Sequence, residues 1–331
     1  MEETTDWIRN VGGGFGTHTA ADELFHGWGA ADDSMSETWF WNFHVPEAKI
    51  NCFAFCWTHP NLKVVTGGLM IYKGFKRQHL ASELFEMRDY NALEAIVGDG
   101  SDIKFPNGMR MQVIKPLEEL HFTFDDLGRE THVNLNMRAV GVPIMRANNQ
   151  HFEQVMHVAG ELILRGERHA VDCYAVRDRS WGEPRPESHA PLPPYLWVTG
   201  AFGTDFSFNV GSHDDPNRNP EWLGKMDVPE HIFKDGWVVV SGEQRRIVRS
   251  SKITEREFPL CRPISHDFEF EDDAGDTYHI TGKVIAQSNW SGWSNMNCHL
   301  GLVEWNWNGR IGHGETQECQ WNDYVWEMGQ G

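Results

Sequence analysis

The stretch Tyr174–Gly182, which reads Tyr-Ala-Val-Arg-Asp-Arg-Ser-Trp-Gly, places one acidic side chain between two basic ones. If this stretch ends a β-strand, successive side chains alternate between the two faces of the sheet. We expect Asp178 to point inward, beside Trp181, while Arg177 and Arg179 point outward. A carboxyl group buried in this way can keep its proton near neutral pH and act as a general acid.

A second interpretation of the same stretch is structural. If Arg177 and Arg179 contact Asp178, its carboxylate stays ionised, and the charge-assisted hydrogen bonds would hold a junction between domains together. The sequence leaves both interpretations open. The substitution Asp178→Asn separates them, because the first predicts loss of activity and the second predicts loss of stability.

Histidines and a glutamate form a second group of candidates for proton transfer. His151, Glu153 and His157 share one face if they belong to a strand. Glu153 is the alternative acid, and these histidines, together with His313, are candidates to relay protons. The pattern His-x-Glu could also belong to a metal site, but a polar strand face satisfied by its neighbours is the favoured interpretation.

Aromatic residues are abundant, with 15 Trp and 19 Phe among 331 residues. Indole faces stabilise cations, and an aromatic-lined cavity suits a carbon-rich ligand. The same rings could instead fill the cores of two β domains. The candidates for the wall of a ligand cavity are Trp39, Trp41, Tyr174, Trp181, Trp290, Trp293 and Asn297. The last three belong to an Asn- and Ser-rich stretch that could also be a plain loop.

The scaffold that the sequence predicts for these residues is almost entirely β, with little helix. Short runs rich in β-branched and aromatic residues alternate with Gly-, Asp- and Pro-containing turns, which is typical of a barrel or a sandwich. The segment 79–97 is ambiguous between a helix and a strand–turn–strand unit. The proline-rich stretch 182–194 predicts a connector between two domains, residues 1–185 and 186–331.

Composition excludes several classes of protein. A formal net charge of −19 argues against binding to nucleic acid or to anionic membranes. The chain has neither an apolar run approaching the ~20 residues of a membrane span nor an N-terminal signal peptide, so we expect a cytoplasmic protein. Its six cysteines form no Cys-x-x-Cys pair and are expected to be free thiols. Without a phosphate-binding loop, a dinucleotide motif or a zinc-protease motif, we expect no cofactor.

Four stretches together carry a resemblance to a known superfamily. They are His151–Gln154, Gly160–Ile163, the Arg-Asp-Arg-Ser-Trp-Gly core of Tyr174–Gly182, and a C-terminal pair, Trp-Asn-Trp-Asn-Gly-Arg and Gly-His-Gly-Glu-Thr-Gln. In these stretches the chain resembles the two-domain, lipocalin-like (calycin) superfamily. That superfamily includes the carotenoid hydratases (hydroxyneurosporene synthases), AttH-like proteins and fungal Diels–Alderases.

The resemblance implies two lipocalin-like β-barrels packed side by side, with a ligand cavity near their junction. It also implies cofactor-independent, non-redox chemistry, and it carries a functional Asp and Trp over to Asp178 and Trp181. We therefore expect a hydratase (lyase) or a cyclase/isomerase that acts on a hydrophobic terpenoid, steroid-like or aromatic compound. Two other classes stay open: a carrier of an apolar ligand that has no catalytic group, and a metal-dependent oxygenase.

Overall fold

Strands dominate the computed structural model, which describes residues 14–27, 35–182, 191–293 and 295–329. Strands account for 62% of the chain and helices for 10%, so the all-β prediction is confirmed. The chain divides into two compact units. The first unit contains the described residues within 15–73 and 80–182. The second contains Gly74–His79 and the described residues after 190.

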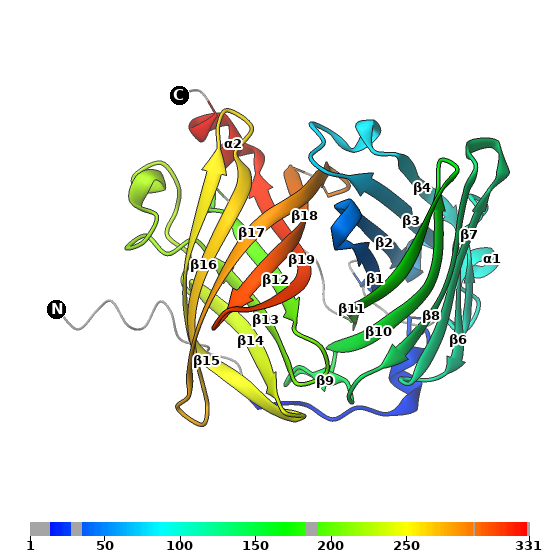
Figure 1. Ribbon diagram of the computed structural model, residues 1–331, viewed down its shortest axis with the longest axis horizontal. Helices are drawn as coiled ribbons and strands as arrows, with labels where there is room; N and C mark the ends of the chain where they lie inside the picture. Colours follow the sequence, from blue (N-terminus) through cyan, green and yellow to red (C-terminus); the bar gives the residue numbers. More distant parts are fainter. Residues whose placement is uncertain (1–13, 28–34, 183–190, 294, 330–331) are drawn as a thin grey trace. The chain divides into compact units, whose positions relative to one another are not determined.

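An 11-stranded antiparallel sheet forms the first unit (Figure 1). Its strands are hydrogen-bonded in the order β4-β3-β2-β1-β11-β10-β8-β7-β6-β5, and the short β9 pairs with β10. This sheet curves into a half-barrel. Its two edge strands, β4 and β5, do not pair with each other, so the first of the two predicted barrels is not closed. The strands are β1 (Glu37–Val45), β2 (Ile50–His59), β3 (Val64–Lys73), β4 (Leu84–Ala92), β5 (Asp102–Lys104), β6 (Arg110–Lys115), β7 (Glu119–Asp126), β8 (Thr131–Ala139), β9 (Ile144–Met145), β10 (His151–Leu164) and β11 (Glu167–Trp181).

Strand β1 is buried along its whole length, and this explains its dense aromatic sequence. Trp39, Trp41 and Phe43 pack into the hydrophobic core of the first unit with aliphatic residues from the neighbouring strands. Phe40 and Asn42 alternate with them on the other face and are also buried. A strand buried on both faces loses the apolar–polar alternation of a half-exposed strand. The imperfect alternation of residues 37–45 therefore reflects two-sided burial.

The second unit is a closed barrel of eight antiparallel strands (Figure 1). Aromatic rings fill much of its interior, with Phe208, Phe268 and Trp305 fully buried. Gly282 makes room for Trp305, because a Cβ atom at Gly282 would lie 2.2 Å from the Trp305 ring. The strands are β12 (Tyr195–Ala201), β13 (Phe206–His213), β14 (Phe233–Val240), β15 (Glu243–Glu257), β16 (Arg262–Asp272), β17 (Thr277–Trp290), β18 (Met296–Trp307) and β19 (Arg310–Trp321).

Helices are short and lie before, between or after the strands. The helix α1 (Leu93–Val97) connects the edge strands β4 and β5, and α2 (Asn322–Met328) follows β19. The segment 79–97, which the sequence left ambiguous, contains a short 3₁₀ helix, the strand β4 and α1, so it is neither one long helix nor a strand–turn–strand unit. The 3₁₀ helices are η2 (Ala20–Glu23), η3 (Pro46–Ala48), η4 (Pro60–Leu62), η5 (His79–Ala81), η6 (Leu127–Arg129) and η7 (Pro220–Trp222). Among the described residues, no helix is long and apolar enough to cross a membrane.

The division into units differs from two consecutive domains in one respect. The predicted boundary, between residues 185 and 186, falls in 183–190, which lie outside the described residues. Gly74–His79, however, belongs to the second unit although β3 and β4 on either side belong to the first. Phe75 forms a β-bridge with Gln287, and the amide of Lys76 donates a hydrogen bond to the Gln287 carbonyl (2.7 Å).

Candidate functional site

The Arg-Asp-Arg-Ser-Trp stretch forms the end of β11, which lies between β1 and β10 in the middle of the sheet of the first unit. As predicted, alternation places Asp178 on one face and the two arginines on the other. The predicted directions are wrong, however. Arg177 and Arg179 are completely buried in the core, whereas Asp178 is partly exposed on the opposite face. Alternation fixes which residues share a face, but not which face is covered by the core.

The burial of Arg177 depends on a carboxylate from a distant part of the chain. Glu23, in η2, binds the Arg177 guanidinium through both carboxylate oxygens, each 2.7 Å from a guanidinium nitrogen. The side-chain carbonyl of Gln154 accepts further hydrogen bonds from Arg177 (2.7 and 3.1 Å). Although burial acts to raise it, the charge and hydrogen bonds of Arg177 hold the pKa of Glu23 below its usual value. Arg177 is thus a fully paired structural anchor.

Arg179 is anchored in a similar way, but among aromatic rings. Its guanidinium donates to Glu37 (2.6 Å) and lies over the Trp39 ring, 3.7 Å from the ring centroid. His26 stacks on Trp181 with 4.3 Å between ring centroids, and its Nδ1 lies 3.4 Å from the Glu37 carboxylate. Trp39 and Trp181 therefore pack around the Arg179–Glu37 pair on the core face. Trp181 does not share a face with Asp178.

The opposite face of β11 brings together three residues that the sequence singled out. Asp178 lies directly opposite Glu153 of β10, and His151 is two residues from Glu153 on the same face. Glu153 is buried and accepts a hydrogen bond from Arg146 (3.2 Å), and it lies 2.7 Å from Nε2 of His151. We refer to Arg146, His151, Glu153 and Asp178 as the carboxylate face. Arg146 was missed because it follows the two-residue strand β9, which the sequence did not reveal.

Phenylalanines continue this face on the neighbouring strands. Phe40 of β1 lies directly opposite Asp178, and its ring centroid is 5.4 Å from that of Phe53 on β2. Phe53 in turn stacks on Phe55 at 5.6 Å. The aromatic surface nearest to Asp178 thus consists of phenylalanines. The predicted wall residues Trp39 and Trp41 belong to the core on the other side of the sheet.

His157 and Tyr174 lie farther along the same face, as a separate pair. They are directly opposite each other on β10 and β11, with 5.2 Å between ring centroids. Nε2 of His157 lies 2.7 Å from the carboxylate of Asp172, whose side chain is largely exposed. His157 is therefore tied to a surface carboxylate. Among the described residues, no group of three or more His, Cys, Asp or Glu side chains is arranged to hold a metal ion.

The remaining predicted residues belong to the second unit. Trp290 and Trp293 contact each other edge to face, with 4.6 Å between ring centroids. Asn297 accepts a hydrogen bond from Asn289 (2.8 Å) and lies 3.1 Å from Nε2 of His299. His313 is 4.0 Å from the carboxylate of Glu304. Trp293 lies between β17 and β18, and His313 pairs with Glu304 seven residues along β18 from Asn297, so these side chains do not form one cluster.

A network of buried charges inside the barrel was missed by the sequence analysis. Arg256 donates to both carboxylate oxygens of Asp214 (2.7 and 3.0 Å) and of Glu318 (2.7 and 3.0 Å), and Lys252 also pairs with Asp214. Two acids and two bases balance each other in this network. The residues are spread over the chain between 214 and 318, so no local motif reveals them.

Two histidines lie close to this network and are held uncharged by burial. Burial lowers the pKa of His266 to about 3 and that of His299 to about 4. Nδ1 of His266 lies 3.2 Å from the Thr254 hydroxyl, whereas its buried Nε2 has no hydrogen-bond partner. The network thus combines paired charges with neutral imidazoles.

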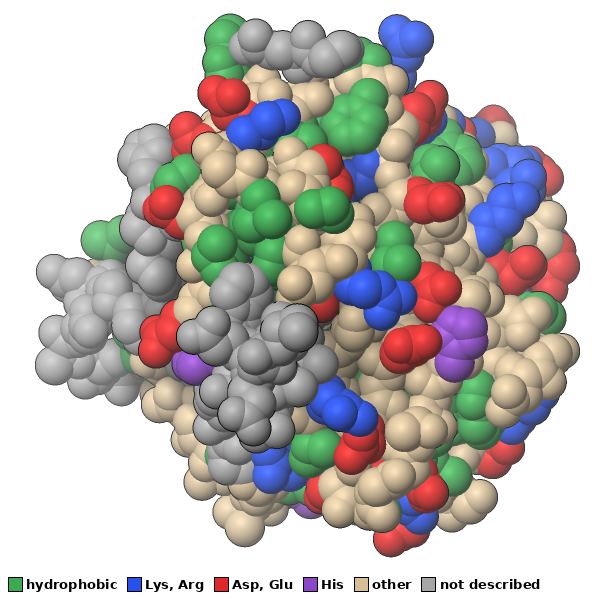
Figure 2. Space-filling model, turned by 90° about the vertical axis from the view of Figure 1, so that its left-hand side faces the viewer, with side chains coloured by type: hydrophobic (Ala, Val, Ile, Leu, Met, Phe, Trp, Pro, Cys, Tyr) green, Lys and Arg blue, Asp and Glu red, His purple; other side chains and the backbone are tan. Residues whose placement is uncertain are grey.

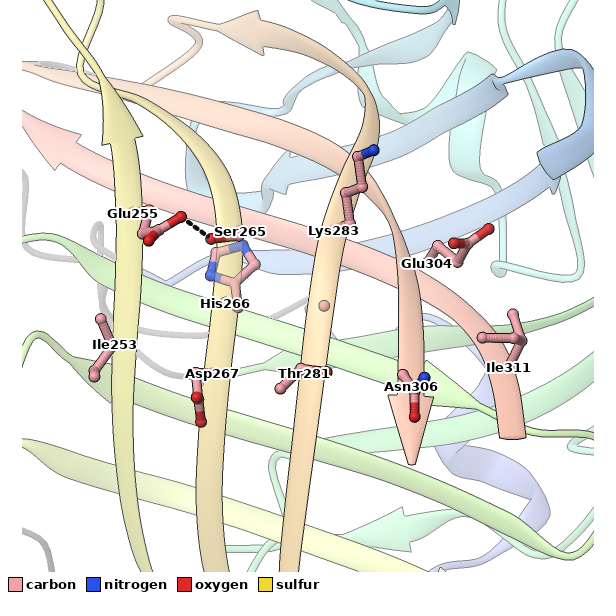
Figure 3. A pocket seen from close by; sticks show the side chains of 11 residues that line it. Ile253, Glu255, Ser265, His266, Asp267, Thr281, Lys283, Glu304, Asn306 and Ile311 are labelled. Atoms are coloured by element: carbon pink, nitrogen blue, oxygen red, sulfur yellow. Dashed lines mark hydrogen bonds between the residues drawn. The ribbon is translucent and has the colours of Figure 1, made fainter. Parts of the chain in front are cut away.

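The outer surface of the barrel carries a groove of about 400 Å³ over β15–β19 (Figure 3). Its walls mix Ile253 and Ile311 with charged side chains such as Lys283 and Glu304, and the Ser265 hydroxyl donates to Glu255 (2.6 Å). On the face shown in Figure 2, basic and acidic side chains are interspersed. The lining of this groove therefore mixes apolar and charged side chains from five strands.

Comparison with solved structures identifies proteins of the same fold. An AttH-type protein from Nitrosomonas europaea superposes with a TM-score of 0.61 at 11% identity, covering 96% of this chain and 100% of that chain. Kievitone hydratase from Nectria haematococca gives a TM-score of 0.56 at 11% identity, covering 96% and 98%. The resemblance to the lipocalin-like AttH and hydratase group is thereby confirmed at the level of fold.

Comparison by sequence is more limited. None of the curated protein sequences matches the chain. One family model, described as a domain of unknown function (DUF7064), matches residues 19–323 and so includes both units. The chain belongs to the DUF7064 family.

Proposed function

We propose that the protein is a hydratase-type lyase that adds water to a carbon–carbon double bond of a hydrophobic small molecule, with Asp178 as the acid. The observation that carries this proposal is the pairing of Asp178 with Glu153 on one face of the sheet, next to the rings of Phe40 and Phe53. The shared fold with kievitone hydratase supports the class of reaction.

The carboxylate face supplies the groups that hydration of an alkene requires. Asp178 donates its proton to one alkene carbon, and a carbocation develops on the neighbouring carbon. The faces of Phe40 and Phe53 stabilise that positive charge through cation–π attraction. A water molecule attacks the cation and gives up a proton to Glu153, so that the net change is the addition of one water.

The proton then returns to Asp178 and closes the cycle. Glu153 and Asp178 are direct cross-strand neighbours, whose Cβ atoms lie within about 4.5–5.5 Å of each other in such pairs. His151, at 2.7 Å from Glu153, can relay the proton, and Arg146 holds the Glu153 carboxylate in place. These steps involve only side chains, substrate and water, so we propose that the reaction needs no cofactor.

The same groups also support isomerisation or cyclisation. If a second double bond of the substrate reaches the cation before water does, a ring closes, and Glu153 removes the final proton. If no nucleophile adds, loss of a different proton moves the double bond. The substrates that suit the phenylalanine rings beside the carboxylates are terpenoid, steroid-like or aromatic compounds.

The test is incubation of the protein with such compounds in water enriched in oxygen-18, followed by mass spectrometry of the products. Hydratase activity incorporates one labelled oxygen, whereas isomerisation and cyclisation give products of unchanged mass. Glu153→Gln should abolish turnover, and Glu161→Gln, which changes a partly exposed carboxylate on the same strand, should leave it unchanged. Binding of the compounds without any turnover would show that the protein is a carrier.

A further inference from the structure

Two cysteines of the barrel lie directly opposite each other on adjacent strands. Cys298 of β18 and Cys319 of β19 are a register pair of the antiparallel ladder, and their sulfur atoms are 3.6 Å apart. Paired residues in such ladders have Cα atoms about 4.5 or 5.5 Å apart, which falls within the range that disulfides span. A disulfide needs sulfur atoms about 2.05 Å apart. Small rotations of the two side chains are therefore enough to join them.

The surroundings of the two thiols differ in a way that gives each a separate role. Cys298 is fully buried, while Cys319 is partly exposed. Burial, reinforced by the hydrogen bond with Cys319, raises the pKa of the Cys298 thiol well above its usual value. Cys319 is accordingly the sulfur that a dissolved oxidant reaches first, and Cys298 is the sulfur positioned to resolve the product.

We infer that Cys298 and Cys319 are a reversible redox site, which closes to a cross-strand disulfide under mild oxidation. With glutathione disulfide as the oxidant, the Cys319 thiolate attacks one sulfur, forms a mixed disulfide and releases one glutathione. The Cys298 sulfur then attacks Cys319, loses its proton and releases the second glutathione. The protein loses two hydrogens and two electrons, and one glutathione disulfide becomes two glutathione thiols.

The disulfide would link β18 to β19 beside the buried charge network. His299 and Glu318, a second register pair of the same two strands, directly follow and precede the cysteines in sequence. Glu318 also binds Arg256. Oxidation would therefore fix the two strands at the point where they contribute to the charged interior of the barrel.

The test treats the folded, full-length protein with glutathione disulfide and maps the products by peptide mass spectrometry. We expect two of the six thiols to disappear, and the peptides containing Cys298 and Cys319 to be joined. Dithiothreitol should restore all six thiols. In urea, where the register is lost, the selectivity for this pair should disappear.

Two variants complete the experiment. Cys298→Ser should stop the reaction at a single glutathione adduct on Cys319, because the resolving thiol is gone. Cys261→Ser, which removes another buried cysteine of the same unit, should leave the disulfide unchanged. Persistent glutathione adducts in the unsubstituted protein, a disulfide between other cysteines, or no reaction in the folded state would each overturn the inference.

Discussion

Asp178 and Glu153 face each other across β11 and β10, on the side of the sheet opposite to Arg177 and Arg179. The positive charges that adjoin Asp178 in sequence are thus neutralised on the core side by Glu23 and Glu37. The arginines of the motif are therefore paired with carboxylates from other parts of the chain. The arginines anchor the sheet, and the aspartate lies on the other face, where we propose that it acts as the acid.

Asp178→Asn is expected to reduce turnover by about 10²–10⁴-fold, the usual contribution of a positioned general acid. The variant should fold normally, because Asp178 is only partly buried and the core contacts of the motif come from the arginines. Steady-state rates and thermal unfolding curves measure the two effects separately. Asp172→Asn, on the same strand and face but largely exposed, is the matched control and should keep full activity. A variant that turns over normally would transfer the role of acid to Glu153.

Arg177→Met should destabilise the protein by about 3–5 kcal/mol, because it leaves the buried Glu23 carboxylate without its partner. Urea unfolding followed by tryptophan fluorescence measures the loss. The double variant Arg177→Met with Glu23→Leu should recover part of it, since no unpaired charge then remains in the core. Arg168→Met breaks an exposed pair with Glu161 and should cost less than about 1 kcal/mol. Equal effects of both arginine substitutions would contradict the anchoring role.

Stability should fall steadily as the pH decreases from about 6.5 toward 4. Burial lowers the pKa of His213 and His299 to about 4 and that of His266 to about 3, from the usual 6.5. In this window the unfolded chain binds protons that the folded chain does not, so each histidine weakens folding by up to ~1.4 kcal/mol per pH unit. Urea unfolding at a series of pH values gives the slope.

A matched pair of histidine variants isolates the contribution of one group. His266→Gln removes one of the three titrating imidazoles and should make the slope shallower. His279→Gln removes an exposed histidine and should leave the slope unchanged. If stability depended on pH with the same slope in both variants, His266 would not be a buried group that stays uncharged in the folded protein.

Gly282→Ala should destabilise the barrel by roughly 1–3 kcal/mol, the usual effect of overfilling a packed core. The added methyl group would lie 2.2 Å from the Trp305 ring, which is itself fully buried. Replacing Trp305 by Leu in the same chain should relieve the clash, so the two substitutions together should be less harmful than their separate effects predict. Strictly additive effects would show that the glycine is not kept for this contact.

The sequence predicted the class of fold because period-2 patterns and turn residues are local signals. It also placed His151 and Glu153 on one face, since residues two apart on a strand always share a face. It could not predict that Asp178 lies opposite Glu153, because register between strands depends on pairing across the whole sheet. Nor could it predict that Glu23 binds Arg177, because 154 residues separate them and no pattern links them.

The tryptophans show a different limit of sequence analysis. Trp39 and Trp41 were expected to line a ligand cavity, but a ring that fills a core and a ring that lines a cavity have the same sequence signature. Only the position of the core distinguishes them, and here it lies on their side of β1. Phe40 and Phe53 lie on the other side of the sheet, but nothing in the sequence distinguished them from the neighbouring aromatic residues as candidates to line a site.

The short segment Gly74–His79 limits how the two halves of this protein can be separated or exchanged. Because it pairs with Gln287, the second unit is assembled from pieces that lie on both sides of most of the first. If the chain were cleaved once, between residues 183 and 190, the C-terminal fragment would lack Gly74–His79, the segment that pairs with Gln287. Recombination between relatives would meet the same obstacle, so the two halves are expected to have been inherited together.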